Sequence, residues 1–142
     1  MSSEIEQEVT SRRNGRTRPL VLIVDTDEAV RLANGSLLAL QGFDTVAVTN
    51  GKQAVVKARQ VWPDAILLDL KLPDLDLDGV DVIREILTTD PPVDVPILIL
   101  TDVRSTRLHA AALDAGAASY MIKGETTLRE VGHAIQRAIS PA

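Results

Sequence analysis

The sequence predicts an α/β fold, a doubly wound parallel sheet of five strands with five helices packed on its two faces. Two observations predict it. Short, continuous aliphatic runs recur along the chain, and segments whose apolar residues follow helical spacing alternate with them. Aliphatic runs of this length are typical of strands buried on both faces. Strands that alternate with helices and connect by right-handed crossovers favour the flavodoxin-like strand order 2-1-3-4-5.

The elements follow in order from Pro19. Aliphatic runs predict strands at residues 20–24, 45–48, 65–68, 97–100 and 119–122. Helical spacing predicts helices at residues 30–40, 52–61, 80–87, 106–115 and 128–139. Two of these helices have a clear apolar face, formed by Val30, Ala33, Leu37 and Leu40 in the first and by Leu128, Val131, Ile135 and Ile139 in the last. Glycine and proline fall between the elements and support these boundaries.

Residues 1–18 differ from the rest of the chain. They contain two aliphatic residues after Met1, three glutamates followed by four arginines, and no sustained periodicity. Such a segment cannot bury enough apolar surface to fold by itself. We therefore expect residues 1–18 to be a disordered tail and residues 19–140 to form one domain.

The composition excludes several classes of protein. The 142 residues contain no cysteine, so disulfides and thiolate metal sites are ruled out. No apolar run is long enough for a membrane span and the N-terminus has no secretory signal, so we expect a cytoplasmic protein that does not enter a membrane. A net charge of −5 and one residue each of Phe, Trp and Tyr argue against direct binding of nucleic acid.

Polar residues stand where four of the predicted strands end: Asp25, Asp69, Thr101 and Lys123. Because ligands bind at the carboxyl ends of the strands in open α/β sheets, we expect these side chains to converge. Two close carboxylates repel each other, so a cation is expected between them, and oxygen ligands favour magnesium over zinc. A carboxylate can also act as the nucleophile towards a phosphoryl group, whose charge then needs a metal, an ammonium and a hydroxyl donor.

Four segments, VLIVDTDEAVR, PDAILLDLKLP, PILILTD and AGAASYMIKG, occur in this order and resemble the receiver domain of two-component response regulators. The resemblance covers residues 19–140. It implies that Asp69 accepts a phosphoryl group and that Asp25 belongs to the acidic pocket. It also implies that Thr101 is the hydroxyl that follows the phosphoryl group, that Tyr120 is an aromatic residue that changes rotamer, and that Lys123 is the cation that pairs with the phosphate.

The same resemblance implies a cofactor and partners. Magnesium would be bound by Asp25, Asp69 and the backbone carbonyl of Lys71. The phosphoryl donor would be a phosphohistidine on a sensor histidine kinase or a histidine phosphotransfer protein. The face formed by the fourth helix, the fifth strand and the fifth helix would change its partner preference, and it is the candidate surface for a homodimer. We expect a signalling domain and not an enzyme, with at most self-catalysed phosphotransfer and autodephosphorylation at Asp69.

Three residues depart from the family pattern. Thr26 stands where the family usually has a second acid that binds magnesium, so its role as a ligand is doubtful and metal affinity should fall. Asp102 stands where a small residue is usual, and it could repel a phosphoryl group or partly replace the missing ligand. Gly124 replaces a common proline. These departures keep an alternative open, a degenerate receiver that acts as a phosphorylation-independent protein-interaction module.

Two further patterns suggest other functions. The loop after Pro73 is two residues longer than is usual in the family, and its residues fit the calcium-loop pattern D-x-D-x-D-G-x5-E at Asp74, Asp76, Asp78, Gly79 and Glu85. A solvated acidic loop is the alternative. The run Asp25-Thr26-Asp27 resembles the nucleophile motif of haloacid dehalogenase-like phosphohydrolases, in which Asp25 instead of Asp69 would carry the covalent adduct.

Overall fold

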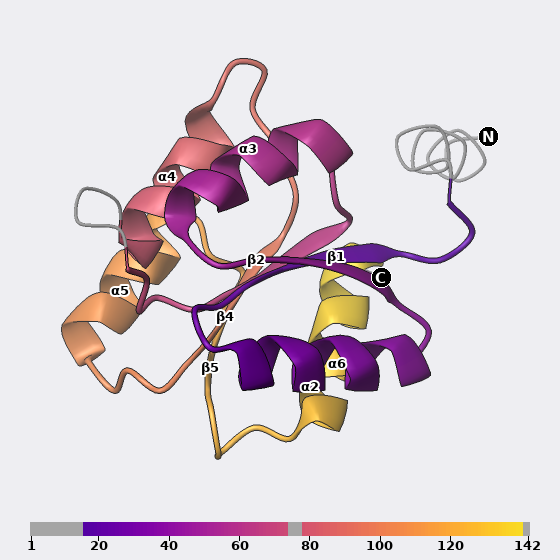
Figure 1. Ribbon diagram of the computed structural model, residues 1–142. Coiled ribbons are helices and arrows are strands. Elements are labelled where there is room, and N and C mark those ends of the chain that lie inside the picture. The colour runs from indigo at the N-terminus through magenta and orange to yellow at the C-terminus, as the bar shows by residue number, and fades with distance from the viewer. Residues whose placement is uncertain (1–15, 74–77, 141–142) are drawn as a thin grey trace.

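The five strands form one parallel sheet in the computed structural model, which describes residues 16–73 and 78–140 (Figure 1). The strand order is β2-β1-β3-β4-β5, as predicted. The strands are β1 (Leu20–Val24), β2 (Asp44–Val48), β3 (Ala65–Leu68), β4 (Ile97–Thr101) and β5 (Ser119–Ile122). The three inner strands are buried along their whole length. The expectation of burial on both faces is wrong for β2 and β5, because these strands lie at the two edges of the sheet and are partly exposed.

Five helices cover the two faces of the sheet (Figure 1). On one face lie α3 (Gly51–Val61), α4 (Gly79–Thr88) and α5 (Thr106–Ala115), and on the other lie α2 (Glu28–Leu40) and α6 (Leu128–Ile139). Each helix begins at a polar side chain that accepts hydrogen bonds from its first turn; these N-caps are Asp27, Asn50, Asp78, Ser105 and Thr127. Within the described residues, no helix has the length and apolar character needed to cross a membrane.

The core consists of two aliphatic layers, one on each side of the sheet. Alternation along β1 divides its side chains between them: Leu22 and Val24 pack towards α3 and α4, whereas Val21 and Ile23 pack towards α2 and α6. Burial therefore fixes the register of the strands, because a shift of one residue would exchange the two layers. The fixed register in turn sets which residues stand at the carboxyl ends of the strands.

The helix α2 forms as predicted, but it does not bury the predicted face. Its buried residues are Asn34 and Leu38, whereas Leu37 and Leu40 are 39% and 83% exposed. Residues 32–40 carry no charge, so the polar side that normally identifies the outward face of a helix is missing from the sequence. Gly35 contributes to this orientation, since a Cβ there would lie 3.3 Å from Oγ1 of Thr45. The sequence pattern alone could not choose between the two faces.

The end of the predicted tail also belongs to the folded domain. The guanidinium of Arg16 donates to the carbonyl of Trp62 over 3.2 Å and lies 3.8 Å from the carboxylate of Asp64. The guanidinium of Arg18 donates to the carbonyls of Ala39, Gly42 and Phe43, behind the end of α2. Residues on the tail side of the boundary expected at residue 18 thus contact the domain, because these two arginines satisfy carbonyl groups at the ends of α2 and α3. Residues 1–15 lie outside the described residues.

Gly79 lets the start of α4 pack closely against the backbone of Leu70. A Cβ at Gly79 would lie 2.5 Å from the backbone Cα of Leu70, which cannot move aside cheaply. We expect Gly79→Ala to lower the free energy of unfolding by about 1–3 kcal/mol, measured as a fall in the urea midpoint. The matched control is Gly132→Ala, where the new Cβ meets only the flexible end of the Gln41 side chain. Equal losses in the two variants would contradict this account.

Candidate functional site

The structure brings together all four polar residues that end the predicted strands. The ammonium of Lys123 donates to Oδ2 of Asp25 at 2.7 Å and to Oδ2 of Asp69 at 2.9 Å. The hydroxyl of Thr101 donates to Oδ1 of Asp69 at 2.5 Å. The exposed fraction is 4% for Asp25, 5% for Asp69 and 0% for Thr101. Two carboxylates, a hydroxyl and an ammonium thus share one small pocket at the carboxyl edge of the sheet.

Backbone hydrogen bonds that continue the sheet hold three of these residues in place. The amide of Asp25 donates to the carbonyl of Val48, and the amide of Asp69 donates to the carbonyl of Val24. The amide of Lys123 donates to the carbonyl of Thr101 at 2.8 Å. Each of these residues is therefore fixed by the neighbouring strand, so the pocket is built on rigid elements and its geometry follows from the register.

The pocket carries more negative than positive charge, because one ammonium faces two carboxylates. Burial lowers the pKa of Lys123, but the hydrogen bonds and the negative charges of Asp69 and Asp25 outweigh it and raise the pKa above its usual value. Lys123 is therefore fully charged at neutral pH. It bridges the two acids and neutralises half of their charge.

Tyr120 lies beside the pocket and not in it. Its hydroxyl donates to the carbonyl of Val103 at 2.7 Å, and the amide of Val103 lies 3.4 Å from Oγ1 of Thr101. Burial, followed by the negative charge of Asp69, raises the pKa of the Tyr120 phenol. The negative charge of the acidic pocket therefore acts on Tyr120, and the hydroxyl of Tyr120 contacts the loop that follows Thr101.

The oxygen atoms at the pocket are suitable ligands for a hard divalent cation. The pocket has one carboxylate fewer than the family pattern. The two carboxylates are those of Asp25 and Asp69, and the amide of Lys71 donates to Oδ1 of Asp69 at 3.1 Å, which places the backbone of Lys71 at the pocket. Oγ1 of Thr26 lies 3.5 Å from the carbonyl oxygen of Lys71. Carboxylates and a carbonyl are ligands that magnesium accepts, and water can complete its coordination.

The part of the chain that the structure describes places no third acid with Asp25 and Asp69. Among residues 16–73 and 78–140, no group of three or more His, Cys, Asp or Glu side chains is placed to hold a metal ion. Asp102 is exposed and belongs to no such group in the described part of the chain. Asp27 has another role, because its carboxylate accepts the amides of Ala29 and Val30 and caps α2. Thr26 remains the position that decides how many carboxylates a metal would meet.

The calcium-loop pattern receives no support from the residues that the structure describes. Asp74 and Asp76 lie outside the described residues. The carboxylate of Asp78 accepts the amide of Asp81, and the carboxylate of Asp81 accepts the amide of Asp78, which together form a capping box. Glu85 lies within α4. Asp78 and Gly79 of the pattern thus form the start of α4 in this structure.

Two contacts near the pocket were not predicted from the sequence. The guanidinium of Arg31, in the first turns of α2, donates to the carbonyls of Asp25 and Thr26 at 2.8 and 2.9 Å and holds the backbone after β1. Arg104 and Glu125 form an exposed ion pair of 2.6 Å that joins the loop after β4 to the loop after β5. No spacing rule predicts either contact, because both depend on how separate loops meet in space.

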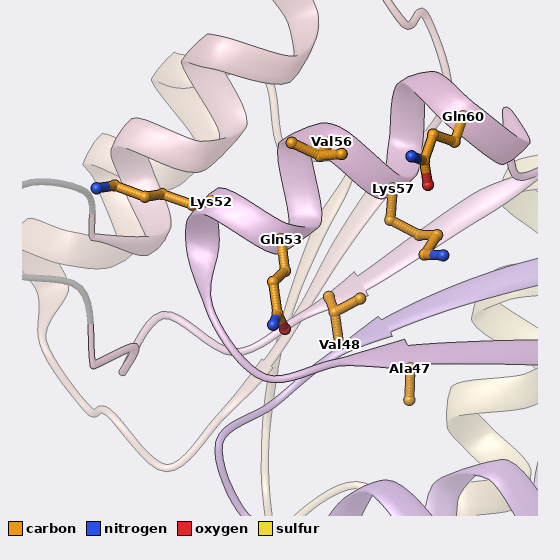
Figure 2. A pocket seen from close by; sticks show the side chains of 7 residues that line it. All are labelled: Ala47, Val48, Lys52, Gln53, Val56, Lys57 and Gln60. Carbon is orange, nitrogen blue, oxygen red and sulfur yellow. The ribbon is translucent and has the colours of Figure 1, made fainter.

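A hollow elsewhere on the surface contains none of the predicted site residues. It has a volume of about 510 Å³ and lies between β2 and α3, with Lys52, Gln53 and Lys57 among its lining residues (Figure 2). Figure 2 shows Val48 and Val56 on the side of the sheet that α3 covers. The strand-end argument located the acidic pocket, which shares no residue with this hollow.

Comparison with protein families decides the class. The model of the family described as the response regulator receiver domain matches residues 21–135. The chain belongs to this family. The receiver domain is a signalling module and generally not an enzyme. The hypothesis of a phosphohydrolase loses its support, because the family match is to a different class of protein. Asp27, the second acid of the phosphohydrolase motif, caps a helix.

Curated relatives extend this assignment. The receiver domain is 38% identical over 109 residues to the transcriptional regulatory protein PrrA of Mycobacterium tuberculosis, covering 77% of this chain and 45% of the relative. It is 32% identical over 117 residues to the gliding motility regulatory protein of Myxococcus xanthus, covering 82% of this chain and 15% of that protein. The chain therefore spans less than half the length of these relatives.

Solved structures agree with the fold. The receiver domain of RstA from Klebsiella pneumoniae, crystallised in a BeF3-activated form, aligns with a TM-score of 0.76 at 25% identity, covering 85% of this chain and 98% of that one. A CheY-like receiver domain protein from Methanospirillum hungatei aligns with a TM-score of 0.79 at 22% identity, covering 87% and 94%. Receiver domains generally bind Mg²⁺ at the acidic pocket, which agrees with the donor set described above.

Proposed function

We propose that this receiver domain accepts a phosphoryl group on Asp69 from a phosphohistidine donor and changes its partner binding in response. The single observation that carries the proposal is the bridge of Lys123 between the buried carboxylates of Asp25 and Asp69. A structural ion pair needs one acid, whereas this lysine meets two at the same edge of the sheet. Such a surplus of buried acid is costly unless it serves a site.

In the proposed reaction, a carboxylate oxygen of Asp69 attacks phosphorus. The new bond is the P–O bond of an acyl phosphate, and the bond that breaks is the P–N bond of the donor, whose imidazole nitrogen then takes a proton from solvent. Lys123 and the hydroxyl of Thr101, both already hydrogen-bonded to Asp69, lie where they can donate to phosphoryl oxygens. Magnesium, when bound by Asp25, Asp69 and the Lys71 carbonyl, would neutralise charge on the same oxygens.

The partner of this reaction would be a sensor histidine kinase or a histidine phosphotransfer protein. The surface that responds would be the face formed by α5, β5 and α6, which is also the proposed surface for a homodimer. The response would be a shift between two conformations of the same fold. We further propose that the protein acts in the cytoplasm without entering a membrane and without binding nucleic acid through these residues.

A second candidate, the degenerate receiver, is favoured by Thr26. This residue supplies a neutral hydroxyl in place of a carboxylate, and the hydroxyl lies against the carbonyl of Lys71. If magnesium cannot bind there, the domain would act as a phosphorylation-independent interaction module.

Asp69→Asn separates these possibilities. Incubation of the full chain with a small-molecule phosphodonor and magnesium should give a phosphoryl adduct by intact mass, and Asp69→Asn should abolish it. The matched control is Asp102→Asn, an exposed acid next to Thr101, which should keep the adduct. No adduct in the parent protein with any donor would favour the degenerate receiver. An adduct that persists in Asp69→Asn would contradict the assignment of Asp69.

A further inference from the structure

A continuous series of contacts leads from the acidic pocket to α5. Oδ1 of Asp69 accepts the hydroxyl of Thr101, and Oγ1 of Thr101 lies 3.4 Å from the amide of Val103. The carbonyl of Val103 accepts the hydroxyl of Tyr120 at 2.7 Å. The ring of Tyr120 stacks on the ring of His109, with the centroids 4.4 Å apart and the planes inclined by 20°. The last member of the series is a side chain that the proposed reaction does not use.

His109 is placed by the start of α5. Ser105 caps this helix by accepting the amide of Leu108, and the amide of His109 donates to the carbonyl of Ser105 at 2.8 Å. The imidazole therefore projects from the first turn of a helix whose origin is the loop after Thr101. Tyr120 comes from β5, where it is the register partner of Ile99 in β4. The loop, the helix and the strand thus meet at the stacked rings.

We propose that His109 is a positioning residue for Tyr120: its imidazole closes over the phenol ring and holds the hydroxyl on the Val103 carbonyl. Tyr120 is only half-buried, so a different χ1 rotamer would carry its ring away from the pocket. One neutral hydrogen bond gives little net stabilisation, and a stacked ring adds to it. Both contacts are lost together if the ring rotates. His109 therefore favours the rotamer that keeps Tyr120 in contact with the loop after Thr101.

The inference rests on the proposed function for its consequence, because the position of Tyr120 matters to signalling only if Thr101 responds to a group on Asp69. His109 is exposed on α5. A partner that covers α5 and contacts the imidazole would change the balance between the rotamers of Tyr120. By linkage, a change at Thr101 that alters this balance would alter the affinity for the partner to the same degree.

The composition allows a direct test on the full chain, because the sequence contains one tyrosine and two histidines. Labelling with 3-fluorotyrosine gives a single ¹⁹F resonance that reports on Tyr120. We expect His109→Ala to shift this resonance towards its position in denaturant. His109→Phe keeps a ring that can stack and should restore the position found without substitution. The control is His133→Ala, at the other histidine, which is exposed on α6 and should leave the resonance unchanged.

Two results would overturn the proposal. One is a ¹⁹F resonance that does not move in His109→Ala while circular dichroism shows the fold intact. The other is an equal shift in His133→Ala, which would indicate a general effect of removing a surface imidazole. If His109→Ala unfolds the domain, His109→Phe decides, because a displaced resonance in that folded variant would contradict stacking. The phosphodonor experiment on Asp69 is separate, so its failure would remove the signalling consequence and leave the position of Tyr120 tested.

Discussion

Replacing Lys123 by alanine is expected to lower the free energy of unfolding by about 3 kcal/mol at neutral pH in the presence of a chelator. The side chains of Asp25 and Asp69 are 5% and 6% exposed, and Lys123 is the cation that bridges them. Removing it leaves two buried carboxylates side by side, without the charge that compensates them. The lysine side chain itself is 23% exposed, so water screens part of the interaction and the value lies at the lower end of the range for buried ion pairs.

The dependence of this loss on pH follows from the direction of the pKa shift. The pKa of Lys123 is raised in the folded state above its usual value of 10.5, because its bonds to the two acids outweigh the effect of burial. The stabilisation by Lys123 is therefore fully present below pH 10.5 and is lost as the pH rises through the folded pKa. The difference between the parent protein and Lys123→Ala should stay constant near neutrality and shrink only in strong alkali.

Urea unfolding followed by circular dichroism, in EDTA, measures both effects. The matched control is Lys71→Ala. The side chain of Lys71 is exposed, and its contacts at the pocket are made by its backbone, so its loss should change stability by no more than about 0.5 kcal/mol. Equal losses in the two variants would show that the bridge contributes nothing particular, and the charge argument for the pocket would then fail.

The pocket could be predicted from the sequence because its geometry depends on a few strand ends. A buried strand has no low-energy place for a charge, so Asp25, Asp69 and Lys123 could only stand where a strand leaves the core. Parallel pairing then brings neighbouring strand ends together. A separate argument predicted the strand order, since short aliphatic runs that alternate with helices leave few topologies.

Features that depend on side-chain packing could not be predicted in this way. The prediction of the buried face of α2 was wrong. This helix has leucines on more than one side, and its last nine residues carry no charge that would identify the exposed side. The contacts of Arg16 and Arg18 depend on carbonyl groups left free at the ends of α2 and α3, which no local pattern announces. The stacking of His109 on Tyr120 joins a helix to a strand, and neither residue alone is distinctive.

Thr26→Asp is expected to strengthen magnesium binding by at least tenfold, which corresponds to roughly 1.4 kcal/mol. The hydroxyl of Thr26 lies 3.5 Å from the carbonyl of Lys71, and no third acid among the described residues reaches Asp25 and Asp69. A carboxylate at this position would give a divalent cation one more charged oxygen. The attraction between a unit negative charge and a cation in contact with it is on the order of 1 kcal/mol in bulk water and on the order of 4 kcal/mol near a protein surface. Thr26 is exposed, so the lower part of this range applies.

The same substitution should have the opposite effect on the metal-free protein. Two buried carboxylates already share one ammonium, and a third acid adds repulsion, so Thr26→Asp should unfold at a lower temperature in EDTA and at a higher one in excess magnesium. Isothermal calorimetry and thermal unfolding measure the two effects separately. Thr26→Val removes the hydroxyl without adding charge, and Asp102→Asn removes an acid outside the pocket, so neither should tighten the metal. If magnesium affinity is the same in Thr26→Asp and Thr26→Val, the residue at position 26 does not control the affinity for the metal. The hypothesis of a degenerate receiver then loses its main support.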